Sequence, residues 1–362
     1  MSQPKIHKVN KGEWSEFYTL LKLLAEQRLY AADENLEKMQ EIFYPVLKVI
    51  EAKGTDKETH YELNEKDDDI KVFLASKDSF FTVSKESLKS KIKEVFLAIK
   101  NSNATFAIPV ASKILDELKR DHVKTISSRK SDIVLVIHDM KTGTDPEVGF
   151  SIKSRLGGAS TILNSSGATN FTYKVEGFTG NIDEINSIVS SSKVRERIKL
   201  IEEKGGELKY HRMDSPIFES NVRKIDSNLP EILAEVLKIY FAGEASTMPE
   251  ICELIKAPGL SFTADNSFFE YKSKEFLLNI ALGMMPNTLW DGHLEAHGGY
   301  IIVREDGEIV CYHIYNLDRF RGYLFDNTKL DTPSTTKHGF GKLYKDNGEL
   351  FFKLNLQIRF IK

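Results

Sequence analysis

The sequence predicts a mixed α/β (α+β) protein, with a central mixed sheet flanked by helices and a strand-rich C-terminal part. Three observations predict this class. Apolar residues recur at helical spacing in several segments, apolar and polar residues alternate in others, and short turn motifs join pairs of the alternating segments. With 41% hydrophobic and 28% charged residues among 362, the chain has the balance of an ordinary globular protein.

Helical periodicity begins near the N-terminus. Residues 14–26, WSEFYTLLKLLAE, place Trp14, Phe17 and Leu21 on one face. A second amphipathic stretch at 33–50 also predicts a helix, bent or broken near Pro45. Further predicted helices cover 87–100, 112–120, 193–204, 229–243 and 273–284. Ser273 is the predicted N-cap of the last.

Strands are predicted at 70–75 and in two late hairpins, one with an Asp-Gly turn and one with an Asn-Gly turn. The polar segment between these hairpins predicts a loop. The acid-rich residues 51–69 predict a solvated linker or hairpin. Residues 131–158, SDIVLVIHDMKTGTDPEVGFSIKSRLGG, predict two strands joined by a polar turn.

Composition limits the class of protein. The formal net charge is −3, which does not by itself indicate a nucleic-acid binder, although one local patch can read DNA. Two cysteines make neither a metal-ligand spacing nor a disulfide framework, as in a reducing cytosol. The sequence shows no apolar signal core and no run near the ~20 residues of a membrane span. We therefore expect a cytoplasmic protein without a membrane partner.

The hairpin at 131–158 has one polar strand face. Alternation along its second strand places Ser151 and Lys153 on that face, together with Glu147, and the apolar neighbours on the other. A lysine inside such a strand is costly unless a nearby group compensates its charge. Asp132, which opens the neighbouring strand, is the expected partner. An Asp–Lys ion pair at a sheet edge is the structural alternative.

An acid and a lysine on adjacent strands also suit metal-assisted phosphodiester hydrolysis. A carboxylate holds Mg²⁺ with few protein ligands and several waters. The metal lowers the pKa of a bound water and stabilises charge on phosphate oxygens. The lysine then positions or activates the attacking water, or stabilises the transition state.

The pattern of Asp132, a hairpin and Lys153 resembles the core of the PD-(D/E)xK nuclease superfamily. Ser151 stands where that pattern has Asp or Glu, so the resemblance implies a replacement ligand. We prefer Glu16 on the first helix, because the Gly-x-x-x-Glu spacing of Gly12 and Glu16 is a form found in this superfamily. Glu13 is the fallback, although a first-turn acid is also favoured by the helix dipole. Glu147 is the other candidate, about four residues (~13 Å) along the strand from Ser151.

Three longer phrases resemble the HpaII family of restriction endonucleases. They are NKGEWSEFYTLLKLLAEQRLYAADENL at 10–36, GFSIKSRLGGASTILNSSGATNF at 149–171 and DTPSTTKHGFG at 331–341. The resemblance implies a bacterial, Mg²⁺-dependent endonuclease that cuts double-stranded DNA at CCGG, partnered by a DNA methyltransferase. We expect a nuclease core at 1–215 and a helical, then strand-rich part at 216–362 that contributes to DNA recognition. A homodimer is compatible with the sequence.

Two segments are candidates for DNA contacts. Residues 151–175 lack acids and offer small donors for phosphates: Arg155, Ser160, Thr161, Asn164 and Asn170. The alternative for this segment is a flexible polar loop. Residues 317–362 have nine Lys/Arg against five Asp/Glu, a local net of +4. Candidate base or backbone readers there are Arg321, Thr335, Thr336, Lys337 and His338.

Two other functions stay open, namely an inactive DNA-binding protein of the same fold and a repair or junction nuclease. A zinc site is not expected at His293, Glu295 and His297, because the glutamate is one position away from its place in the His-Glu-x-x-His motif.

Overall fold

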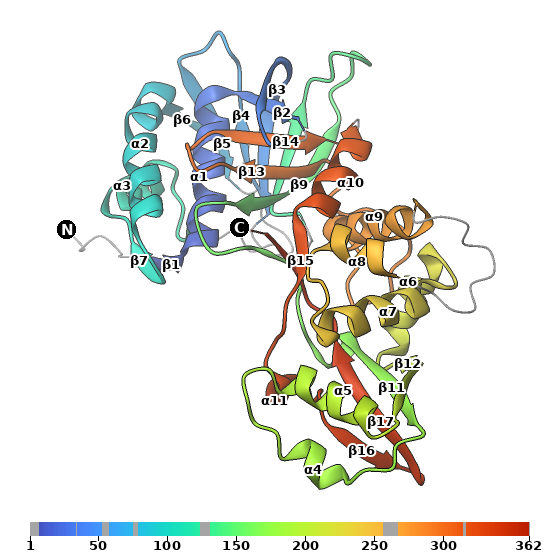
Figure 1. Cartoon of the computed structure of the whole chain (residues 1–362). Coiled ribbons are helices and arrows are strands. Elements are labelled where there is room, and N and C mark those ends of the chain that lie inside the picture. The colour runs from blue at the N-terminus through green and yellow to red at the C-terminus, as the bar shows by residue number, and fades with distance from the viewer. Residues whose placement is uncertain are drawn as a thin grey trace. The chain divides into compact units, whose positions relative to one another are not determined.

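The computed structural model describes residues 7–33, 35–52, 58–74, 79–123, 131–255, 267–313 and 316–361 (Figure 1). The chain forms two compact units. Unit 1 comprises residues 1–160 and 294–320, and unit 2 comprises residues 161–293 and 321–361. The units therefore interleave along the chain. The predicted division into functional parts near residue 215 stays a prediction.

Unit 1 is built on a nine-stranded mixed sheet in the order β2-β14-β13-β9-β8-β3-β4-β5-β6. Its strands are β2 (Arg28–Ala32), β3 (Lys38–Ala52), β4 (Glu58–Glu62), β5 (Asp69–Leu74), β6 (Phe80–Ser84), β8 (Ile133–Ile137), β9 (Glu147–Ser154), β13 (Gly299–Val303) and β14 (Ile309–His313). β13 runs parallel to β9 and β14 parallel to β2, while the other pairs are antiparallel. Since β2 also pairs with β3, six of these strands close into a barrel.

The helices of this unit are α1 (Lys11–Glu26), α2 (Lys85–Asn101) and α3 (Pro109–Glu117), and α10 (Leu317–Asp326) begins in it. α1 and α2 contact the sheet, and α3 contacts α2. A small ladder joins β1 (Lys8–Asn10) to β7 (Thr105–Ala107). α1 contacts both β9 and β3, and its predicted apolar face is buried: Trp14 and Phe17 are each 1% exposed, and Leu21 is fully buried. Burying each such side chain contributes about 1.5–3 kcal/mol. The predicted first helix is confirmed.

The helix predicted at 33–50 is wrong. Residues 38–52 form the long strand β3, which pairs with β2, β4 and β8. Tyr44 and Val46 are buried on the alternate spacing of a strand, and the segment is rich in β-branched residues. Pro45 is tolerated next to the irregularity in the β3–β8 register, where its carbonyl accepts from His138 N at 2.8 Å.

Unit 2 contains two smaller sheets and most of the remaining helices. One sheet has the order β12-β11-β17-β16 and the other β10-β18-β15. Their strands are β10 (Thr161–Leu163), β11 (Asn170–Glu176), β12 (Glu207–Met213), β15 (Thr328–Leu330), β16 (Leu343–Asp346), β17 (Glu349–Asn355) and β18 (Ile358–Phe360). The helices are the 3₁₀ turn Gly167–Thr169, α4 (Ile182–Asn186), α5 (Lys193–Glu203), α6 (Pro216–Ile225), α7 (Leu229–Ala242), α8 (Met248–Leu254), α9 (Ser267–Leu282) and α11 (Thr335–His338).

Most local predictions hold in these elements. Both late hairpins are confirmed, β13–β14 in unit 1 and β16–β17 in unit 2, and the Asn347-Gly348 turn has positive φ at both residues, as a type I′ hairpin turn requires. Ser273 is not an N-cap. It lies inside α9, is 1% exposed and contacts the sulfur of Cys252. The predicted loop between the hairpins contains β15 and α11, so it is more ordered than expected.

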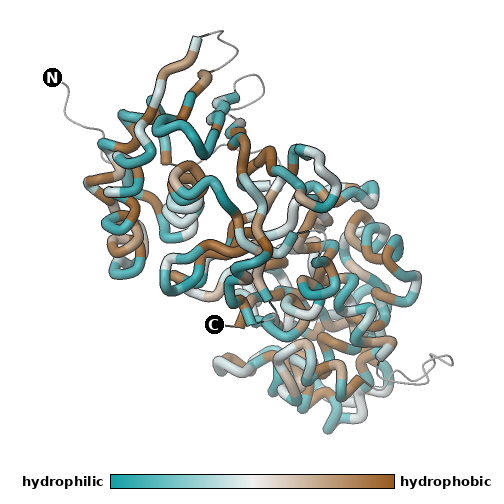
Figure 2. The backbone as a smooth tube through the Cα atoms, turned by 90° about the horizontal axis from the view of Figure 1, so that it is seen from above, coloured by the Kyte–Doolittle hydropathy of each residue, from teal (hydrophilic) through white to brown (hydrophobic). Residues whose placement is uncertain are grey.

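Figure 2 shows hydrophobic and hydrophilic residues mixed along the whole backbone tube. Within the part of the chain that the structure describes, no helix is both long and apolar enough to span a bilayer.

Candidate active site

Asp132, Ser151 and Lys153 lie together in unit 1, across the β8–β9 pair. The Ser151 hydroxyl donates to Asp132 Oδ2 at 3.0 Å and accepts from Lys153 Nζ at 3.0 Å. Asp132 Oδ2 also accepts from the backbone N–H of Ile152 at 2.7 Å. The carboxylate and the ammonium are therefore joined through a hydroxyl, and these two described residues make no direct ion pair. We call these three residues the Asp–Ser–Lys cluster.

The register of the sheet creates this cluster. Ile133 pairs with Phe150, and Asp132 N donates to Phe150 O at 2.8 Å, which brings Asp132 beside Ser151. Phe150 is fully buried and Ile152 is 7% exposed, so the predicted apolar face of β9 is confirmed. On the other side of β9, Tyr300 of β13 pairs with Ser151. Its ring centroid lies 5.2 Å from Lys153 Nζ, a cation–π contact that helps to hold the half-buried ammonium.

The N-terminal part of α1 is fixed beside the end of β9. The hydroxyls of Ser15 and Ser154 are 2.8 Å apart, and Lys11 Nζ donates to Leu156 O at 2.9 Å. Glu16 follows Ser15 on this helix and is half-buried. This residue already interacts with another group of the protein. Glu13 closes a capping box, since its carboxylate accepts from Asn10 N at 3.1 Å. That contact gives Glu13 a structural role at the helix start.

The predicted metal ligands do not form a cluster of three acids. Among the described residues, no group of three or more His, Cys, Asp or Glu side chains is arranged to hold a metal ion. Glu147 is exposed at the start of β9, and its carbonyl accepts from His297 Nε2 at 3.1 Å. Asp132 Oδ1 accepts no hydrogen bond from the described residues and is not buried. One available carboxylate oxygen beside a hydroxyl fits Mg²⁺, which keeps several waters.

The HpaII restriction endonuclease family matches the chain over residues 10–360. The chain belongs to the HpaII restriction endonuclease family. The type II restriction enzyme HpaII of Haemophilus parainfluenzae is 40% identical over 358 residues, which cover 97% of this chain and 98% of that enzyme. No solved structure matches the chain. The resemblance predicted from the three sequence phrases is confirmed.

In this family member, two predicted DNA-contact segments meet inside unit 2. His338 Nε2 lies 3.1 Å from Ser165 Oγ, and Asn170 Nδ2 donates to His338 O at 2.9 Å. Asn170 is 4% exposed and its side-chain oxygen accepts from Asn355, so it supports the α11 segment and does not face solvent. Thr336 and Lys337 are exposed on α11.

The other predicted contact residues differ in their freedom to bind. Arg155 is half-buried, and its guanidinium has no ion pair within the described part of the chain. Asn164 is exposed, whereas Ser160 and Thr161 are partly buried. Arg321 is already paired with Glu275, with Nε and Oε1 2.6 Å apart.

Sequence reasoning missed Tyr300, which contacts Lys153, and the Ser15–Ser154 contact between α1 and the end of β9. Ser15 and Ser154 lie in phrases that carried the resemblance, but they are 139 positions apart. Tyr300 sits in a predicted strand, and nothing local indicates that this strand lies beside β9. In the segment where no zinc site was expected, the His293 side chain is 85% exposed in a loop, and His297 Nε2 contacts the backbone carbonyl of Glu147.

Proposed function

We propose that this chain is a type II restriction endonuclease that cuts both strands of DNA at CCGG, with the Asp–Ser–Lys cluster as its catalytic centre. The single observation that supports this site is that the Ser151 hydroxyl links Asp132 to Lys153 across adjacent strands. Family membership over nearly the whole chain supports the reaction class. A cognate methyltransferase in the same bacterial cytoplasm would protect the host DNA.

Unit 1 is the proposed PD-(D/E)xK core. Support comes from the mixed sheet, in which β8 and β9 are antiparallel and β13 is parallel to β9, and from α1 packed on β9. Ser151 occupies the place of the second acid in that pattern. Its hydroxyl cannot supply the missing negative charge, so the proposal needs a further oxygen ligand. Glu16 on α1 remains the preferred candidate and Glu147 the weaker one.

Each residue of the cluster has a distinct task. Asp132 would hold Mg²⁺ through Oδ1, while Ser151 and the Ile152 N–H fix the orientation of its other oxygen. When bound, the cation lowers the pKa of a water molecule and stabilises negative charge on the phosphate. Ser151 and the Tyr300 ring hold the Lys153 ammonium in place. From there it would donate a hydrogen bond to the attacking water or to a phosphate oxygen.

An inactive DNA-binding protein of the same fold is the second candidate function. The observation that favours it is Ser151 itself, because loss of one acid removes a metal ligand. A repair or junction nuclease sharing this core is the third.

Digestion of plasmid DNA separates these candidates. The purified protein is incubated with Mg²⁺ or with EDTA, and the ends of the products are sequenced. We expect discrete fragments that end at CCGG, formed only with Mg²⁺ and blocked by methylation of the site. Fragments that end at another sequence would support the metal-dependent mechanism and exclude CCGG as the target. Cutting without sequence preference would favour a junction nuclease, and binding without cutting would favour the inactive protein.

A further inference from the structure

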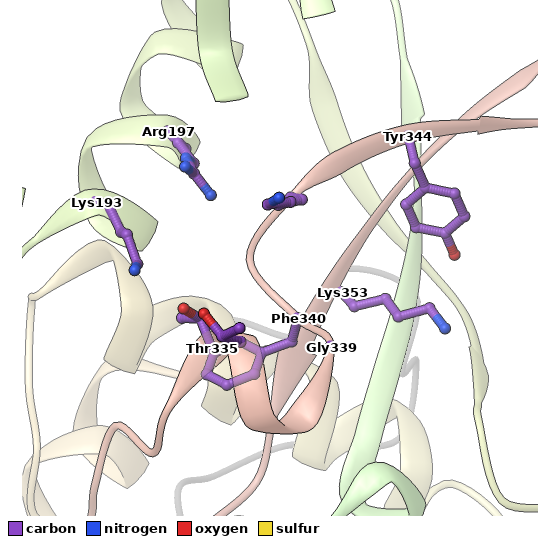
Figure 3. A pocket seen from close by; sticks show the side chains of 9 residues that line it. Lys193, Arg197, Thr335, Gly339, Phe340, Tyr344 and Lys353 are labelled. Atoms are coloured by element: carbon purple, nitrogen blue, oxygen red, sulfur yellow. The ribbon is translucent and has the colours of Figure 1, made fainter. Parts of the chain in front are cut away.

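Unit 2 contains a basic cavity, of whose lining the sequence analysis had singled out only Thr335 and Thr336. Its volume is about 390 Å³, and α5, the α11 segment and the β16–β17 hairpin form its walls. Figure 3 shows Lys193 and Arg197 reaching from α5 toward the segment that carries Thr335 and Phe340. Tyr344 and Lys353 lie on the strands opposite. The lining residues are Lys193, Arg197, Thr335, Thr336, Gly339, Phe340, Lys342, Tyr344 and Lys353.

The charge of this cavity is one-sided. Four of its lining residues are cationic, and none of the described residues that line it is acidic. Lys353 is neutralised by Asp214 at 2.7 Å. Lys193 and Lys342 make no ion pair with any described residue. The cavity therefore carries positive charge that the protein leaves uncompensated.

Arg197 adds a buried charge that has no carboxylate partner among the described residues. It is 3% exposed, and within that part of the chain its guanidinium donates to the backbone carbonyls of Gly341, Asn186 and Ile188. Its Nε is buried and has no hydrogen-bond partner among the described residues. Burying an arginine costs free energy unless an anion compensates it. A ligand anion in this cavity would provide that compensation.

A second hollow continues the first. It has a volume of about 550 Å³ and shares Lys193, Thr335 and Thr336 with the basic cavity. It adds Arg195 and three consecutive serines at 190–192, and again none of its described lining residues is acidic. Cations interleaved with hydroxyl donors over two adjoining hollows suit a chain of phosphates better than one small anion.

We propose that the basic cavity binds the sugar-phosphate backbone of DNA, with Lys193 and Lys342 as phosphate contacts and Arg197 as the buried charge behind them. This proposal rests on the proposed function, because it assumes that DNA is the substrate. Thr335 and Thr336 supply hydroxyls for the same backbone. Contacts of this kind set affinity and carry no sequence information.

The test compares two double variants. Lys193→Ala/Lys342→Ala removes two charges that line the cavity. The matched control Lys199→Ala/Lys345→Ala removes two exposed lysines from the same helix and the same hairpin, outside the cavity lining. Affinity for a CCGG duplex and for a scrambled duplex is measured in EDTA at several salt concentrations, so that no cleavage enters the result. Thermal unfolding confirms that both variants fold.

For the cavity variant we expect affinity to fall about tenfold or more for both duplexes, and the salt slope to decrease by about 1.8, since each phosphate contact contributes about 0.9. The control should change the slope by much less. An unchanged slope would overturn the proposal, and so would a loss confined to the CCGG duplex, which would indicate base readout. A different experiment tests the proposed function itself. If the unsubstituted protein does not cut DNA with Mg²⁺, the proposed function fails, whatever the binding data show.

Discussion

At the scale of single residues, Ser151 is the main departure of the proposed active site from the PD-(D/E)xK pattern. A serine in place of an acid removes a charge, yet its hydroxyl contacts both charged members of the cluster. An aspartate here would bring a second carboxylate beside Asp132 and would pair with Lys153 directly. With serine in this position, Asp132 supplies the negative charge of the cluster. We therefore infer that Ser151 orients the cluster and does not bind the metal alone.

Ser151→Ala should slow cleavage about 10–100-fold, because losing hydrogen bonds to charged groups costs about 1.5–3 kcal/mol. Lys153 Nζ would lose its hydroxyl acceptor, while Asp132 would keep the Ile152 N–H. Single-turnover cleavage measures the rate, and binding in EDTA should change less than about twofold. Ser151→Thr, which keeps the hydroxyl, is the control. Equal rates for Ser151→Ala and the unsubstituted protein would exclude an orienting role.

Asp132→Ala should abolish cleavage and leave DNA affinity unchanged or improved, because it removes a carboxylate that faces phosphate. Lys153→Ala should also abolish cleavage, but it should weaken binding slightly, since it removes a cation. Cleavage assays and equilibrium binding on one duplex separate the two effects. Retained cutting by either variant would place the catalytic centre elsewhere.

At the scale of elements, α1 and β9 act as one support for the site. The Ser15–Ser154 contact and the Lys11 bond to Leu156 O fix where the helix begins relative to the end of the strand. The capping box at Asn10 and Glu13 defines the first turn. Glu16 is the next acid on this fixed helix, whereas Glu147 lies at the opposite end of β9 from Lys153.

This arrangement predicts an order for the two glutamates. Glu16→Gln should reduce cleavage strongly, by about 100-fold or more, if Glu16 completes the metal site. Glu147→Gln should reduce it only a few-fold. Titration of activity with Mg²⁺ is the measurement, and Glu16→Gln should also raise the Mg²⁺ concentration needed for half-maximal activity. The reverse order would make Glu147 the replacement ligand.

A buried ion pair joins Glu51 of β3 to Arg120, which follows α3, and it tests the fold independently of function. Glu51 accepts from Arg120 at 2.7 Å and from the Tyr61 hydroxyl at 2.8 Å, and all three residues are buried. Burial raises the pKa of Tyr61 well above its usual value, with a further contribution from the Glu51 charge. Glu51→Ala should lower the free energy of unfolding by about 3–5 kcal/mol, because Arg120 is left buried without its carboxylate.

The control for this prediction is Glu62→Ala, since Glu62 pairs with Lys48 at 3.3 Å on the surface of the same strands. It should cost at most about 1 kcal/mol. Urea unfolding of both variants provides the comparison. Equal losses would show that the Glu51 pair is not the stabilising contact of these strands.

At the scale of the whole molecule, sequence reasoning worked where one segment carries its own pattern. The β8–β9 hairpin, α1 and the two late hairpins depend on alternation, helical spacing and turn residues that lie within a few positions. β3 was missed because its apolar spacing is ambiguous and its partners come from separate parts of the chain. The basic cavity was missed for the same reason, since α5 and β16 are about 150 positions apart.

The stability of the protein should depend on pH through His313. This side chain is 2% exposed between the rings of Tyr44 and Phe150, and burial lowers its pKa from 6.5 to about 4. The nearby Asp139 carboxylate opposes this change in pKa, while His297 and Lys141 add to it. Because the unfolded chain binds this proton more readily, stability is fully present above pH 6.5 and is lost as pH falls toward 4.

The free energy of unfolding should fall by about 3 kcal/mol over that interval, because a tenfold difference in proton affinity between the folded and unfolded chain corresponds to about 1.4 kcal/mol. Urea unfolding at pH 7 and pH 4.5 measures it, and His313→Gln, which has no proton to bind, serves as the comparison. The variant should be less stable at pH 7 and should lose less stability on acidification. Parallel pH profiles for the two proteins would assign the acid sensitivity to other groups.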